Sequence, residues 1–149
     1  MGWLEDLRGK VVGLDSAPVM YYVDKHPDYI EMLRPFFAMV DRGECSVVTS
    51  VMTLLEGLVI PIRKNDEDLA RKYYSLLYDI DGVKTVAISP NIAEKAAQLR
   101  AFHTVHTPDA IHIATAISLG ASVFLTNDNA LSSIPGIKVL VLNKLKTDS

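Results

Sequence analysis

The sequence has a single cysteine, no long apolar run and no large excess of either charge. One cysteine, Cys45, excludes an internal disulfide framework and a metal knuckle built from cysteine pairs. No apolar run approaches the roughly 18 residues that a membrane span needs, and the first residues lack the apolar core of a signal peptide. We therefore expect a cytoplasmic protein with no membrane partner.

The charge balance is only slightly acidic. Lys and Arg number 15 against 18 for Asp and Glu, so the formal net charge is -3. This balance excludes a strongly basic coat for nucleic acid, but it allows an enzyme that meets nucleic acid at one small site. The hydrophobic share of 49% and the charged share of 22% are those of a folded domain, and 149 residues fit a single one.

Short apolar runs rich in β-branched residues alternate with longer helical patterns. Because most runs show no polar alternation, they are typical of strands buried on both faces of a parallel sheet. The predicted strands are 11–14, 46–49, 85–88, 122–126 and 139–142. This order predicts an α/β fold, a three-layer α/β/α sandwich with a mainly parallel central sheet of about five strands.

Capping signals and prolines predict where several helices begin and end. Pro35 lies inside the helical pattern 28–42 and predicts a kink or break there. Ser89-Pro90 and Thr107-Pro108 each combine an N-cap residue with proline at the first helical position. Further helices are expected over 50–59 and 66–79. The domain core is then 10–142, with an amino-terminal extension 1–9 and a polar carboxyl-terminal tail 143–149.

Four acidic residues lie near the edge of the sheet where sites form in open parallel sheets. Asp15 ends the first strand, Glu56 lies in an apolar helix after the second, Asp109 is in the first turn of a helix, and Asp128 follows the fourth strand. Each alone has an ordinary explanation, as a helix cap, a surface residue, a first-turn residue or a turn residue. Their common location is harder to explain in that way.

Carboxylates gathered at one place repel one another unless a cation neutralises them. Oxygen ligands of this kind favour Mg²⁺ or Mn²⁺ over zinc. Such ions activate water and stabilise the charge that develops when a phosphoryl group is displaced. We therefore expect chemistry on a phosphodiester or a phosphate ester.

Four segments resemble the PIN-domain ribonucleases, and most nearly the toxins of VapBC-type toxin–antitoxin pairs. They occur in the family's order and at family-like separations. The segments are LDSAPV (14–19), TSVMTLLEG (49–57), TPDAIHIATA (107–116) and FLTND (124–128). The resemblance implies a PIN-like domain that cleaves RNA internally with a metal-activated water. It also implies a homodimer and a cognate antitoxin protein as partners.

The same resemblance implies a role for each acid. Asp15 and Asp109 would bind Mg²⁺ or Mn²⁺ directly. Glu56 and Asp128 would complete the acidic set, through water or a second ion. All four are therefore expected to be catalytic.

Other polar residues near the acids are weaker candidates. By resemblance, Ser16 and Thr126 would orient the cluster, and Asn127 would support it. Arg100 either stabilises the end of its helix or reaches RNA phosphate or the acidic cluster. Of the histidines, His112 shares a helix face with Asp109. We expect it to be a packing residue, and the alternative is that it tunes the site.

Two other functions are weighed against the ribonuclease. A phosphatase of the haloacid-dehalogenase kind needs a second aspartate two positions after the first, where this chain has Ala17. A PIN-like RNA- or protein-binding domain without catalysis is the other alternative. The presence of all four acids argues against it.

Overall fold

A parallel sheet forms the centre of the computed structural model, which describes residues 2–147. Its five strands lie in the order β3-β2-β1-β4-β5, and every neighbouring pair is parallel. The strands are β1 (Val11–Leu14), β2 (Ser46–Ser50), β3 (Val83–Val86), β4 (Val123–Thr126) and β5 (Lys138–Val141). The predicted fold class is therefore confirmed, with β1 at the centre of the sheet.

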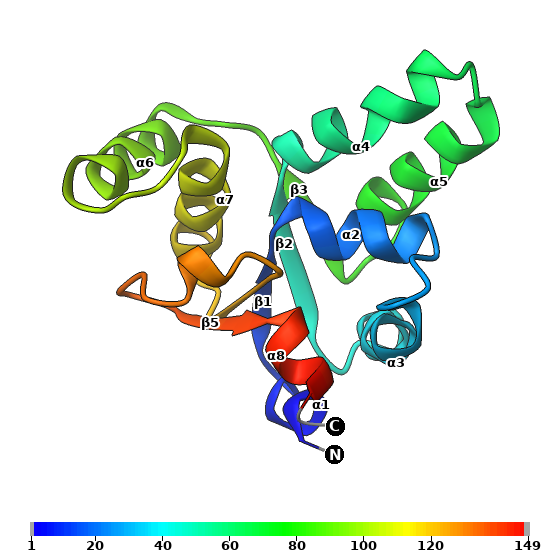
Figure 1. Ribbon diagram of the computed structural model, residues 1–149, viewed down its shortest axis with the longest axis horizontal. Helices are drawn as coiled ribbons and strands as arrows, with labels where there is room; N and C mark the ends of the chain where they lie inside the picture. The colour runs from blue at the N-terminus through cyan, green and yellow to red at the C-terminus, as the bar shows by residue number, and fades with distance from the viewer. Residues whose placement is uncertain (1, 148–149) are drawn as a thin grey trace.

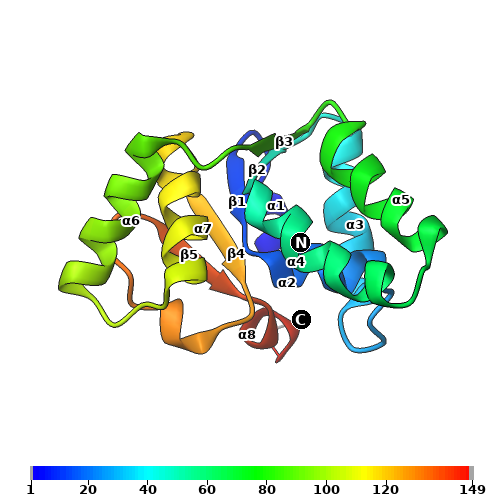
Figure 2. The same cartoon turned by 90° about the horizontal axis from the view of Figure 1, so that it is seen from above.

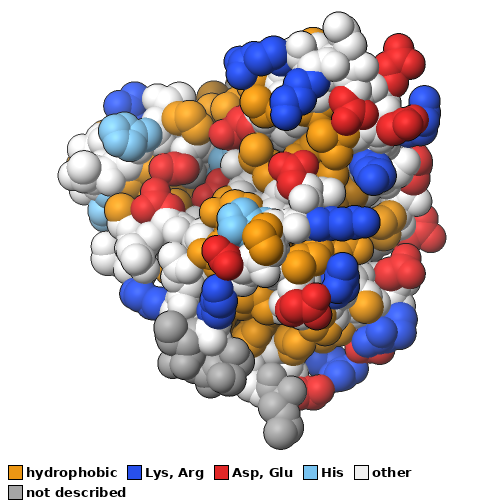
Figure 3. Space-filling view, turned by 45° about the vertical axis from the view of Figure 1, so that its right-hand side comes forward, with side chains coloured by type: hydrophobic (Ala, Val, Ile, Leu, Met, Phe, Trp, Pro, Cys, Tyr) orange, Lys and Arg blue, Asp and Glu red, His pale blue; other side chains and the backbone are white. Residues whose placement is uncertain are grey.

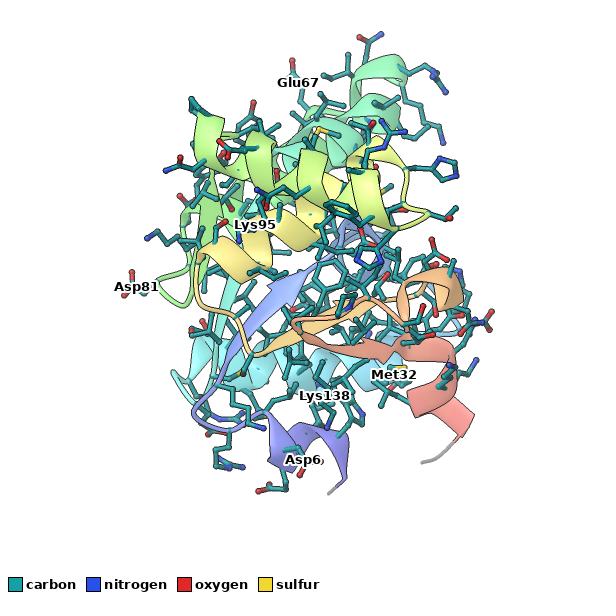
Figure 4. All side chains as sticks on the ribbon, turned by 90° about the vertical axis from the view of Figure 1, so that its left-hand side faces the viewer. Asp6, Met32, Glu67, Asp81, Lys95 and Lys138 are labelled. Atoms are coloured by element: carbon teal, nitrogen blue, oxygen red, sulfur yellow. The ribbon has the colours of Figure 1, made fainter. Side chains whose placement is uncertain are left out.

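Helices cover both faces of the sheet (Figures 1 and 2). One layer contains α2 (Ser16–Val23), α3 (Ile30–Asp41), α4 (Val51–Arg63) and α5 (Glu67–Tyr78). The other contains α6 (Pro90–Phe102) and α7 (Thr107–Ser118). Figure 4 views this second layer from outside, with α6 lying over α7 and α7 next to the strands. The shorter helices are α1 (Trp3–Asp6), η1 (Asn129–Leu131) and α8 (Leu142–Thr147).

Each face of the sheet has its own apolar core. The core under α2, α3 and α5 includes the buried rings of Phe36 and Tyr73. The core under α6 and α7 includes Ile113 and Phe124, both fully buried. All four residues of β4 are buried, as expected for a strand covered on both faces.

The two helices that contain an internal proline continue through it. The sequence predicts a kink or break at Pro35, whereas α3 runs unbroken from Ile30 to Asp41. The helix expected to end at residue 59 continues through Pro61 to Arg63. A proline costs an internal hydrogen bond, but helix stability in proteins comes mainly from packing of the apolar face. In α3 that face is buried, with Phe36 and Phe37 in the core.

The structure also differs from the sequence predictions at the boundaries of several elements. The third strand is 83–86 rather than 85–88. Ser89 caps α6 as predicted, through its hydroxyl and the Ile92 amide. Thr107 is not the N-cap of α7, because His106 occupies that position without a side-chain bond and Thr107 is the first helical residue.

The ends of the domain are more ordered than the sequence suggests. The predicted polar tail begins within α8, whose first residue, Leu142, is fully buried; residues 148–149 lie outside the described part. In the amino-terminal extension, Trp3 stacks on Phe36 and Leu7 is buried. Residue 1 is likewise outside the described part.

Within residues 2–147, no helix has the length and apolar character that crossing a membrane would require.

Candidate active site

Asp15 sits directly after the central strand and is held at both carboxylate oxygens. Its Oδ1 accepts a hydrogen bond from the Ser16 backbone amide at 2.8 Å, which caps α2. Its Oδ2 accepts from the Thr126 hydroxyl at 2.7 Å. Asp15 is 6% exposed. Two hydrogen-bond donors, one on each oxygen, fix the orientation of this buried carboxylate.

Thr126, at the end of β4, connects Asp15 to Asp128. Its hydroxyl gives its one proton to Asp15 and accepts a bond from the Asp128 backbone amide at 3.1 Å. The Asp128 carboxylate in turn accepts from the Ala130 amide at 2.9 Å and caps η1. This arrangement requires β1 and β4 to be neighbours, which their parallel pairing provides.

Asp109 lies in the first turn of α7, near the carboxylates of Asp15 and Asp128. Burial raises the pKa of its carboxyl, and the charges of Asp15 and Asp128 raise it further. His112 and His106 act in the opposite direction, with smaller effects. Asp109 is therefore close enough to both other aspartates to feel their charge.

Glu56 reaches the site from α4, in the opposite helical layer. Its Oε1 lies 2.9 Å from His112 Nε2. The same Nε2 atom is 3.8 Å from Asp15 Oδ1. The His112 side chain is buried, whereas that of Glu56 is 32% exposed. The structure thus brings residues from β1, α4, α7 and β4 to one edge of the sheet.

His112, which the sequence predicts to be a packing residue, lies next to two acids of the site. It is buried as expected, but its ring also contacts Glu56 and Asp15. Its position three residues after Asp109 was the available signal, because such residues share a helix face.

Asn127 turns toward a different set of partners. Its amide nitrogen donates to the hydroxyls of Tyr29, at 3.0 Å, and Tyr21, at 3.3 Å. Its carbonyl oxygen accepts from the Asn143 backbone amide at 2.9 Å. The Tyr29 hydroxyl also donates to the Asn143 side chain. Asn127 thereby connects the loop after β4 to α8 and to the first helical region.

Arg100 holds the loop that leads into α7. Its Nε donates to the Val105 carbonyl at 3.0 Å, and its Nη1 donates to the Thr107 hydroxyl at 2.9 Å. These bonds fix the start of the helix that carries Asp109. A contact between Arg100 and RNA phosphate stays a prediction.

The acids suit a hard cation by their chemistry, although they do not form a closed cage. Among residues 2–147, no group of three or more His, Cys, Asp or Glu side chains is arranged to hold a metal ion. Yet the negative charges of Asp15 and Asp128 raise the pKa of Asp109, so the three carboxylates lie near one another. Oxygen donors in that condition fit Mg²⁺ or Mn²⁺, which commonly keep bound waters between themselves and some of their protein ligands.

A separate groove of about 1050 Å³ lies between α2, α3 and α5. Figure 3 views this side of the molecule, where hydrophobic surface lies between charged side chains. Its lining residues are Tyr22, Val23, Lys25, Ile30, Arg34, Asp68, Arg71, Lys72, Ser75, Leu76, Asp79 and Ile80. The four acids of the site are not among them.

Several solved structures share this fold. VapBC2 of Rickettsia felis, bound to a promoter DNA fragment, matches with a TM-score of 0.69 at 15% identity, over 88% of this chain and 98% of that one. VapC20 of Mycobacterium tuberculosis, described as a sarcin–ricin loop cleaving toxin, gives 0.68 at 15%, over 87% and 98%. DNA-bound VapBC of Salmonella typhimurium gives 0.61 at 20%, over 89% and 98%.

The family of this chain is shown by a match of its sequence to a family model. Among curated proteins, none matches it significantly. The model of the PIN domain matches residues 14–137, from the end of β1 to the residue before β5. This span contains Asp15, Glu56, Asp109 and Asp128. The chain therefore belongs to the PIN domain family.

Proposed function

We propose that this protein is a metal-dependent endoribonuclease that hydrolyses RNA phosphodiester bonds. The observation that carries the proposal is the convergence of Asp15, Glu56, Asp109 and Asp128 at the carboxyl edge of the sheet, with Asp109 under the charge of its neighbours. Membership of the PIN domain family supports it.

In this proposal Asp15 and Asp109 hold the ion, and Glu56 and Asp128 complete the acidic set. Mg²⁺ or Mn²⁺, when bound, supplies an activated water and stabilises the charge of the displaced phosphoryl group. Thr126 keeps the Asp15 carboxylate oriented through its 2.7 Å hydrogen bond. Arg100 fixes the first turn of α7, and so the position of Asp109, through Val105 and Thr107.

We further propose that the protein is the toxin of a toxin–antitoxin pair and forms a homodimer. The similar folds belong to toxin–antitoxin structures, which supports an antitoxin partner. The exposed face of α4 supports a protein contact. Leu55 is 59% exposed and Ile62 is 65% exposed, with Val59 between them at helical spacing. Exposed apolar surface of this kind is typical of interaction sites.

The ribonuclease proposal is tested with purified protein and a mixed set of structured RNAs. We expect cleavage with Mg²⁺ or Mn²⁺ and none with EDTA. Asp15→Asn and Asp109→Asn should each lower the rate by more than about 100-fold, beyond the loss typical of outer-shell metal partners. The exposed Asp81→Asn, before β3, serves as the matched control and should cleave at the wild-type rate.

The alternatives give different results. RNA binding without cleavage under every metal condition would favour a binding domain. Release of phosphate from a monoester, with intact RNA, would favour a phosphatase. Cleavage that persists in both aspartate variants would place the chemistry elsewhere.

A further inference from the structure

His112 has one hydrogen bond from its ring, and that bond is directed at the acids. Its side chain is 1% exposed, and its Nε2 atom lies 2.9 Å from Glu56 Oε1 and 3.8 Å from Asp15 Oδ1. Its other nitrogen, Nδ1, is buried and has no hydrogen-bond partner among the described residues. The ring is therefore held by the packing around it in the core and by its hydrogen bond with Glu56.

This environment selects which ring nitrogen carries a proton. With a proton on Nδ1 alone, a buried N–H would have no acceptor and the Nε2 lone pair would face two carboxylate oxygens. With a proton on Nε2, the ring donates to Glu56 and leaves only an unpaired lone pair at Nδ1. The surroundings of His112 therefore favour a proton on Nε2.

The hydrogen bond between Glu56 and His112 also joins the two helical layers. Glu56 belongs to α4, and His112 belongs to α7 in the other helical layer. Figures 1 and 2 show the two helices on opposite sides of the sheet, approaching each other at its edge. Glu56 is partly exposed, and a long acidic side chain loses rotamer entropy when it is held in one place. Without His112, the Glu56 carboxylate is free to turn toward solvent.

We propose that His112 is a positioning residue that donates its Nε2 proton to Glu56 Oε1 and holds this carboxylate beside Asp15. The inference rests on the proposed function, because it assigns Glu56 to the metal-binding acid set. Partners that orient metal ligands in this way typically change metal affinity or activity by about 10–100-fold when they are removed.

The first test compares substitutions of His112 that differ in where, and whether, they place a hydrogen-bond donor. His112→Gln carries an amide N–H near the reach of Nε2, whereas His112→Asn reaches only as far as Nδ1, and His112→Leu has no donor. Mn²⁺ affinity is measured on the RNA-free protein by electron paramagnetic resonance, and RNA cleavage is measured in single turnover. We expect both to fall by about 10–100-fold in His112→Leu and His112→Asn and to recover largely in His112→Gln. His103→Leu, at the exposed end of α6, is the matched control and should behave as the wild type.

The second test asks whether His112 acts through Glu56. In the Glu56→Ala background, His112→Leu should cause little further loss of Mn²⁺ affinity. Losses that add in the double variant would contradict a positioning role. Thermal unfolding checks that each variant is folded. If His112→Leu does not fold, Glu56→Ala alone must show the expected loss of affinity, and wild-type affinity there would overturn the inference.

A third measurement needs neither metal nor RNA. Long-range ¹H–¹⁵N correlation spectra of the wild type should show a proton on Nε2 of His112, and an unprotonated Nε2 would overturn the inference. The failures of the two proposals are distinguishable. A wild type that neither binds Mn²⁺ nor cleaves RNA removes both, whereas an active wild type with unchanged His112→Leu and His112→Asn variants removes only the positioning role.

Discussion

The surroundings of Asp109 oppose the charge of its carboxylate. Burial and the charges of Asp15 and Asp128 raise its pKa above the ordinary value of 3.8. Between the unfolded and folded pKa values, the folded state binds more protons than the unfolded state. Stability therefore falls as the pH rises through this window, and the cost is fully present above the folded pKa.

Replacing Asp109 by Asn should therefore stabilise the metal-free protein at pH 7. With metal present, the same change should lower the cleavage rate by more than about 100-fold. The gain should shrink as the pH is lowered toward 3.8, where the wild-type carboxyl is increasingly protonated. Urea unfolding in EDTA at a series of pH values measures this difference, with the exposed Asp81→Asn as control. A variant that is no more stable than the wild type at pH 7 would contradict the electrostatic account of this residue.

At this scale the sequence predicts which acids lie near one another better than it predicts their hydrogen-bond partners. Asp15, Asp109 and Asp128 are recognisable because each adjoins a strand or a helix start. The hydrogen bond from Thr126 to Asp15 joins residues 111 positions apart, and it depends on β1 pairing with β4. The contact between His112 and Glu56 is harder to predict, because the neighbours of His112 along α7 are mostly apolar and suggest packing.

At the scale of elements, the distance between β1 and α7 sets the distance between the acids they carry. Gly13 lies two residues before Asp15, and a Cβ at this position would be 2.3 Å from the Ala116 Cβ on α7. The backbone can approach the helix this closely only because Gly13 has no side chain. This contact therefore helps hold the helix of Asp109 against the strand of Asp15.

We expect Gly13→Ala to lower the free energy of unfolding by about 1–3 kcal/mol through overpacking. Ala116→Gly should cost about 1 kcal/mol alone, as a glycine inside a helix. Combined, the two changes should be less costly than their sum, because the clashing methyl group is gone. Urea denaturation of the four proteins measures the coupling, and additive losses would contradict the proposed close packing.

The elements themselves were predictable because their apolar runs and caps are local signals. Pro35 predicts an interruption, but α3 continues through it, and α4 likewise continues through Pro61. A local breaker signal was overridden by tertiary packing, which a single sequence pattern does not contain. The pairing of each strand with its neighbours is equally non-local, so the strand order could not be predicted from the sequence.

For the whole molecule, the four site acids outnumber the net negative charge of -3. Apart from the four site acids, the chain has 14 acidic and 15 basic residues, so the remainder is nearly neutral. Such a surface attracts RNA only weakly through its phosphates. We therefore propose that RNA is bound at the acidic site with its proposed cation, rather than on a basic surface.

The most direct measurement is the single-turnover rate of RNA cleavage as the Mg²⁺ concentration is raised from zero in the wild type and in Asp15→Asn. The acid cluster predicts a rate that rises from background to saturation in the wild type, is abolished by EDTA, and stays more than about 100-fold lower in Asp15→Asn. A cleavage rate that is independent of Mg²⁺, or equal in the two proteins, would contradict a metal-dependent site at these carboxylates.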